Sequence, residues 1–209
     1  MGHSEYAPNL FLVVHDPFSG KLEISRELLD CGLVAAELAH LIIDGWLEIV
    51  DDRVVVAGGG PCADQVDAFV VQSVARQRNQ HTVRIWIETL GEVLHGLIAE
   101  SLIDQRIIRR EQRRGLVRRG PEQFPAVDLL RASGPRLRLD SMLRDPSSFT
   151  LAGAVNAALI GAMGIERILE TEVDREFFDE LTRNLPTQLR MLMDGVTSAV
   201  AAVTLTIRR

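Results

Sequence analysis

Apolar positions along most of this chain recur at the three- and four-residue spacing of amphipathic helices. The pattern predicts helices over residues 25–43, 64–78, 81–103, 127–144, 146–163, 174–184 and 187–205. The most regular of them is 81–103, whose predicted inner face consists of Val83, Trp86, Ile87, Leu90, Val93, Leu94, Leu97, Ile98 and Leu102. Its opposite face carries Glu88, Glu92, Glu100 and Asp104. The chain is therefore predicted to be mainly α.

Two short stretches have the pattern of β-hairpins instead. Residues 46–50 and 53–56 form the first, joined at Asp51-Asp52. Residues 106–111 and 115–119 form the second, with 112–115 as its turn. The predicted fold is a compact single-domain helical bundle with two small β-hairpins. We expect an N-terminal tail over 1–9, whose Met-Gly-His-Ser start is typical of residues added for expression, and one helical domain over 10–209.

The most apolar stretches, 151–165 and 196–207, are shorter than the roughly 20 residues that cross a bilayer. They are expected to be buried helices, so any membrane contact should be peripheral. Cys31 and Cys62 stand alone, with no signal for a disulfide or a metal site. The expected location is the cytoplasm, with peripheral attachment to a membrane.

Positive charge is concentrated in one place, residues 106–119, called the arginine segment below. It holds seven arginines and a single acid, giving +6, while the rest of the chain has 16 basic and 28 acidic residues, giving −12. An acidic protein that gathers its cations on one hairpin is expected to direct them at an anionic partner. The alternative is a solvated hairpin without a ligand.

Catalytic motifs are missing from the sequence. No serine has the Gly-x-Ser-x-Gly context, no histidines have metal-ligand spacing, and the three glycines at 58–60 lack the Gly-Lys-Ser/Thr of a P-loop. Glu88 and Glu92 lie one helical turn apart, which is typical of a solvated helix face. We expect no enzyme activity, no metal and no cofactor.

The order of several local motifs resembles the Golgi phosphoprotein 3 family over nearly the whole chain. These motifs are Gly32-Leu33 with Glu37-Leu38-Ala39, Gly45-Trp46-Leu47, Pro61-Cys62-Ala63-Asp64, Thr82-Val83-Arg84-Ile85-Trp86-Ile87 with Leu90, Ile107-Ile108-Arg109-Arg110-Glu111, Phe124-Pro125 and Asp145-Pro146. The resemblance implies a compact helical domain that docks on membranes. Eukaryotic members recognise phosphatidylinositol 4-phosphate and act as sorting adaptors, and their hairpin takes part in self-association and membrane contact.

The resemblance also locates the headgroup pocket of eukaryotic members, which uses one tryptophan and three arginines. The matching positions in this chain are Ser25, Val34, Glu92 and His95. Without the guanidinium groups the charge-assisted bonds to a phosphate are lost. Specific recognition of phosphatidylinositol 4-phosphate is therefore not expected at these positions.

The leading hypothesis is a peripheral adaptor whose hairpin faces anionic lipid headgroups. The lipid-binding residues would be Arg106, Arg109, Arg110, Arg113, Arg114, Arg118 and Arg119, with Leu116 and Val117 as a membrane or oligomer contact. The expected partners are anionic lipids, a protein cargo and further copies of the chain. Two alternatives stay open: a winged-helix DNA-binding protein, which the acidic face of helix 81–103 disfavours, and a soluble oligomeric interaction module.

Overall fold

The computed structural model describes residues 5–58, 64–114 and 119–207, and all their side chains except those of 113, 114, 119, 120 and 204–207. This part of the chain is mainly helical, which confirms the predicted fold class. The elements are α1 (Tyr6–Val13), α2 (Arg26–Ile43), β1 (Leu47–Val50), β2 (Arg53–Val56), α3 (Gln65–Arg76), β3 (His81–Thr82), α4 (Val83–Asp104), β4 (Glu111–Arg114), β5 (Arg119–Gln123), α5 (Leu129–Arg144), α6 (Leu151–Met163), α7 (Arg175–Asn184) and α8 (Thr187–Ile207), with short 3-10 turns at Pro146–Ser148 and Glu166–Ile168.

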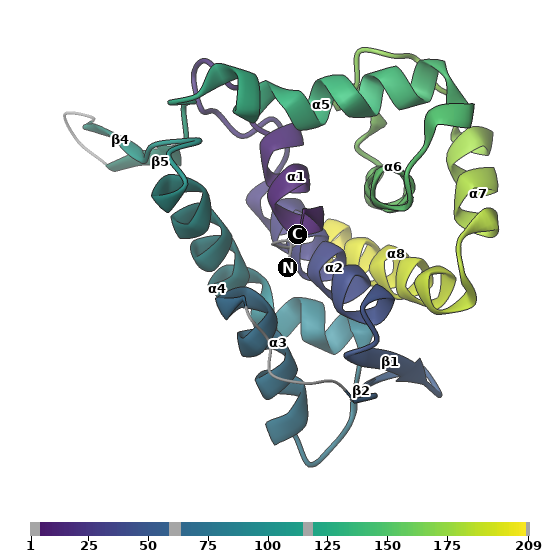
Figure 1. Ribbon diagram of the computed structural model, residues 1–209. Coiled ribbons are helices and arrows are strands. Elements are labelled where there is room, and N and C mark those ends of the chain that lie inside the picture. Colours follow the sequence, from purple (N-terminus) through teal and green to yellow (C-terminus); the bar gives the residue numbers. More distant parts are fainter. Residues whose placement is uncertain (1–4, 59–63, 115–118, 208–209) are drawn as a thin grey trace.

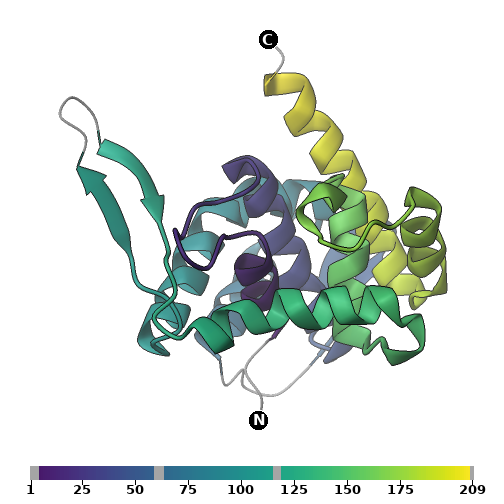
Figure 2. The ribbon, with the colours of Figure 1, turned by 90° about the horizontal axis from the view of Figure 1, so that it is seen from above.

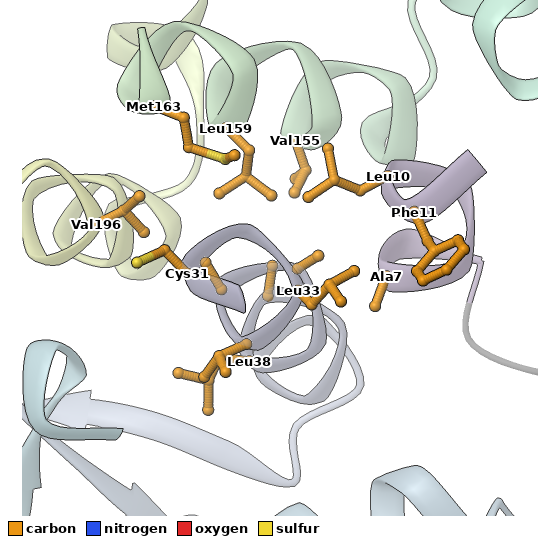
Figure 3. Packing of buried hydrophobic residues seen from close by; sticks show 14 of the residues in the cluster. Ala7, Leu10, Phe11, Cys31, Leu33, Leu38, Val155, Leu159, Met163 and Val196 are labelled. Carbon is orange, nitrogen blue, oxygen red and sulfur yellow. The ribbon is translucent and has the colours of Figure 1, made fainter. Parts of the chain in front are cut away.

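Helix α2 is the centre of the core. It starts where Ser25 accepts a hydrogen bond from the Leu28 amide, and it is buried around most of its circumference from Leu29 to Leu41. Helices α1, α4, α6 and α8 pack around it (Figure 1). Figure 3 shows apolar side chains of α1, α6 and α8 converging on it. A Cβ at Gly32 would lie 2.7 Å from the Met163 sulfur, so glycine lets α6 approach α2 closely.

The first predicted hairpin forms a three-stranded sheet rather than a two-stranded one. Strands β1 and β2 pair antiparallel around the Asp51-Asp52 turn, where both aspartates have positive φ. Strand β3 then pairs with β2, so residues 81 and 82 are extended and the helix predicted from 81 begins at Val83 instead. The reason is capping: the extended Thr82 accepts a hydrogen bond from the Ile85 amide.

The second hairpin exists, but its strands lie further along the chain than predicted. Strand β4 pairs antiparallel with β5, opposing Glu111 to Gln123 and Arg114 to Arg119. Residues 107 and 108, predicted to be in the first strand, are instead buried at 6% and 2% exposure. The two isoleucines are anchored in the core, which displaces the exposed hairpin to the residues that follow them.

Three smaller expectations differ from the structure. Helix α1 begins at Tyr6, inside the segment expected to be a tail, because Ala7 is fully buried in the core. The helix predicted over 146–163 is divided, since Thr150 caps α6 by accepting from the Gly153 amide. Val93, expected on the inner face of α4, is 46% exposed. None of the helices in the described ranges is both long and apolar enough to span a bilayer.

Candidate functional site: the arginine hairpin and its base

The β4–β5 hairpin projects from the end of α4 and stands away from the helical body (Figures 1 and 2). Its base is fixed by backbone bonds on both sides. The Ile107 amide donates to Leu102 O, and the Val127 amide donates to Ile107 O. An isolated bridge joins Ile108 to Ala126. The projecting part is therefore carried on a rigid, buried stem.

A turn far away in sequence completes this stem. The Phe124 amide donates to Gly20 O at 2.9 Å, and the Ala126 amide donates to Pro17 O at 2.9 Å. Gly20 has φ +67°, and a Cβ there would collide with the backbone at Phe124 and Pro125. Only glycine combines this left-handed conformation with so close an approach.

An aromatic cluster lies under the stem. The Phe11 ring stacks on His15 with centroids 4.2 Å apart, and it also contacts His95 and Phe124. His15 and His95 are 5% and 4% exposed, and the His15 ring Nδ1 is 2.7 Å from Phe11 O. Burial lowers the pKa of His15 to about 4 and that of His95 to about 3. Both rings are therefore neutral at pH 7.

Two arginines of the segment are engaged with acids of the same chain. Arg109 binds Glu111 through Nε and Nη2 at 2.8 and 2.7 Å. Arg110 donates to Glu100 of α4 at 2.7 Å, lies 3.5 Å from Glu122 of β5, and stands over the Phe124 ring at 5.8 Å. Exposed ion pairs stabilise little, but these hold the two guanidinium groups close to the hairpin base.

The remaining predicted binding residues divide into three groups. Arg106 is exposed, has φ +57°, and its side chain joins no ion pair within the described residues. Arg113, Arg114 and Arg119 lie in the hairpin strands, and their side chains fall outside the described part. Leu116, Val117 and Arg118 lie outside the described residues altogether.

The four positions that the resemblance placed at a headgroup pocket do not form an exposed anion site. Ser25 is occupied as the cap of α2, and Val34 is fully buried in the core. His95 is buried in the aromatic cluster, and Arg26 is among the neighbours that lower its pKa. Only Glu92 is exposed, and its negative charge would repel a phosphate.

A second surface with exposed leucines and arginines begins next to the hairpin base, on α5, and its residues are not among the predicted binding residues. Leu130 and Leu137 are 81% and 58% exposed. A Leu-Arg pair at 130–131 repeats at 137–138, out of phase with the buried positions Ala132, Leu139 and Leu143. This repeat of an apolar residue off the buried face is the sequence signal from which the surface could be predicted.

Within residues 5–58, 64–114 and 119–207, no group of three His, Cys, Asp or Glu side chains is placed so that it could hold a metal ion. The acidic face of α4 is exposed at Glu88, Glu92 and Glu100, as expected. A helix with that face would be repelled by the phosphates of DNA. The winged-helix alternative therefore gains nothing from this geometry.

The family model described as Golgi phosphoprotein 3 (GPP34) matches residues 7–203. A comparison with curated proteins gives no match.

Proposed function

Because the chain belongs to the Golgi phosphoprotein 3 family, we propose that it is a peripheral adaptor that docks on anionic membrane lipid through its arginine segment. The family is a non-catalytic adaptor family whose eukaryotic members bind phosphatidylinositol 4-phosphate. The observation that carries the proposal is the +6 charge of residues 106–119 on a hairpin that projects from an otherwise acidic molecule.

The outer half of the hairpin is the part we assign to lipid. Arg109 and Arg110 are held by Glu111, Glu100 and Glu122 at the base. Arg113, Arg114 and Arg119 lie further along the hairpin strands, and Arg118 precedes Arg119 in the sequence. These four arginines form the proposed contact, with Arg106 beside the base. Basic residues near an anionic surface contribute about 1 kcal/mol each. Two engaged arginines would thus strengthen binding by about 30-fold.

The lipid proposed is anionic in general, not a single phosphoinositide. Val34 and His95 are buried and Ser25 is a helix cap, so these positions offer no cationic pocket for a headgroup. Binding should therefore follow surface charge density. It should also weaken as salt rises, because exposed charges are screened.

The experiment is co-sedimentation with vesicles of phosphatidylcholine alone, with added phosphatidylglycerol, and with added phosphatidylinositol 4-phosphate. Replacing Arg113, Arg114, Arg118 and Arg119 by Gln should reduce binding to both anionic vesicles about 30-fold or more. The matched control removes four exposed charges elsewhere, at Arg76, Arg78, Arg84 and Arg175, and should bind like the wild type. Equal binding by the hairpin variant and the wild type would refute the proposal, as would no wild-type binding.

A further inference from the structure

The outward face of α5 carries apolar side chains where a surface helix normally carries polar ones. Leu130 is 81% exposed and Leu137 is 58% exposed. The two are seven positions apart, so they lie on one line along the helix, and Arg144 continues that line. The buried positions, Ala132, Pro135, Leu139 and Leu143, lie on other sides of the helix.

Arginines flank this line. Arg131 and Arg138 follow the two leucines directly and are exposed, as is Arg144. None of the three forms an ion pair with an acid within the described residues. Arg131 donates a hydrogen bond to the backbone oxygen of Gln105 at 3.0 Å. The fourth arginine of α5, Arg136, is turned inward and binds Glu23 at 2.8 Å.

Three carboxylates on and around α5 accept hydrogen bonds from backbone amides. Asp140 is 2% exposed and accepts from the amides of Glu170 and Thr171. Asp128 and Asp145 flank the helix and accept from the amides of Arg131 and Ser147. Glu5 lines a groove with Arg138 without an ion pair between them. The outward face is therefore apolar and cationic, with no exposed acid within the helix.

Helix α5 begins beside the hairpin that is proposed to contact lipid. In Figure 2 the helix runs uncovered from the base of the hairpin, and the hairpin and α5 are both seen without other elements in front of them. The line from Leu130 to Arg144 is about 20 Å long at 1.5 Å per residue. The exposed Phe18 lies in the turn that is bonded to the hairpin base.

We infer that α5 is a second membrane-contacting element, which lies flat on an anionic lipid surface with Leu130 and Leu137 inserted and Arg138 and Arg144 at the headgroups. An interfacial helix combines apolar insertion with electrostatic attraction, and arginine side chains can reach the headgroups while their stems stay near apolar surface. This inference rests on the proposed function but assigns the contact to residues outside the arginine segment.

The first test uses two double variants in the vesicle assay. Leu130→Ser with Leu137→Ser should weaken binding to phosphatidylglycerol vesicles about 10-fold. Arg138→Gln with Arg144→Gln should weaken it about 30-fold, from about 5-fold for each arginine. Val50→Ser with Val56→Ser and Arg76→Gln with Arg78→Gln are the matched controls and should bind like the wild type. The altered side chains are exposed, so thermal unfolding should change little.

The second test reports on insertion directly. Leu137→Trp should show a blue-shifted emission and quenching by brominated lipid beyond that of the wild type, whose Trp86 is buried and Trp46 is half-buried. Val56→Trp, on the sheet at the other end of the molecule, should show neither (Figure 1).

The outcomes separate this inference from the proposed function. If the wild type binds vesicles, the hairpin variant loses binding and both α5 variants bind normally, α5 is not a membrane element while the hairpin proposal stands. If the Leu→Ser pair lowers the mass of an assembly in light scattering and leaves vesicle binding intact, the leucines form a protein contact and the inference is wrong. If the wild type does not bind, both proposals fail.

Discussion

Individual buried histidines give this protein an acid-sensitive centre beneath the hairpin. His15 and His95 share an apolar cluster with Phe11 and Phe124, and Arg26 lowers the pKa of both beyond the effect of burial. His40 behaves in the opposite way. Burial alone would lower its pKa, but the carboxylates of Asp67, Asp44 and Asp64 more than offset this and raise it.

The sign of the pH dependence follows from these shifts. His15 and His95 have folded pKa values of about 4 and 3, against 6.5 when unfolded, so only the unfolded state takes up protons as pH falls below 6.5. The free energy of unfolding should fall by about 2 kcal/mol per histidine between pH 6.5 and 4.5. Urea unfolding at several pH values measures this fall.

Single substitutions identify the source of the fall. His95→Leu should remove about half of it. His40→Leu should leave most of the fall in place, because the stability due to His40 is lost only as pH rises through its raised folded pKa. If stability is flat from pH 6.5 to 4.5 in the wild type, the two rings are not held neutral by burial.

At the scale of elements, the hairpin is positioned by its docking rather than by its own two strands. An isolated two-stranded hairpin is marginally stable in water. Here the stem is bonded to the turn at 16–20, and Arg110 joins the strands to α4 and to the Phe124 ring. Loss of the contact with this turn should therefore destabilise the whole β4–β5 hairpin.

Gly20 is the residue on which this docking depends most directly. Gly20→Ala should lower the free energy of unfolding by about 3 kcal/mol or more, since it adds left-handed strain and a collision with the backbone at Phe124 and Pro125. Gly45→Ala is the matched control: its φ is +76° with nothing within 4 Å of the added Cβ, so it should lose about 1 kcal/mol. Chemical unfolding of the two variants compares them, and equal losses would mean that the turn can separate from the stem.

At the scale of the whole molecule, charge is divided unevenly. The arginine segment carries +6 and the remaining residues −12, so the hairpin of one copy is complementary to the acidic surface of another. Helix α4 exposes Glu88 and Glu92 as one such surface. This division supports self-association as well as lipid contact.

We therefore predict a homo-oligomer at low salt that dissociates as salt rises, because exposed charge pairs are screened over about 10 Å at 0.1 M salt. Size-exclusion chromatography with light scattering at low and high salt measures the mass. The Gln variant of Arg113, Arg114, Arg118 and Arg119 should be monomeric at both. A mass that is the same at both salts, or is unchanged in this variant, would contradict an arginine-mediated assembly.

The sequence by itself determined the helices from α2 onward and the presence of both hairpins, but not helix α1. Ser25 and Asp64 mark helix starts by local capping, and apolar spacing gives the inner side of the helices apart from single positions such as Val93. These signals act between residues a few positions apart. They can be read without knowing what the helix packs against.

Only the tertiary structure decided the features that join distant segments. Strand β3 forms because it meets β2, the β4–β5 strands shift because Ile107 and Ile108 are buried, and Arg110 is held by Glu100 and Phe124. The same holds for α5, where periodicity gives the inner face but cannot show that nothing covers Leu130 and Leu137. Pairing and burial depend on which surfaces meet after folding, and contacts between distant residues leave no local pattern in the chain.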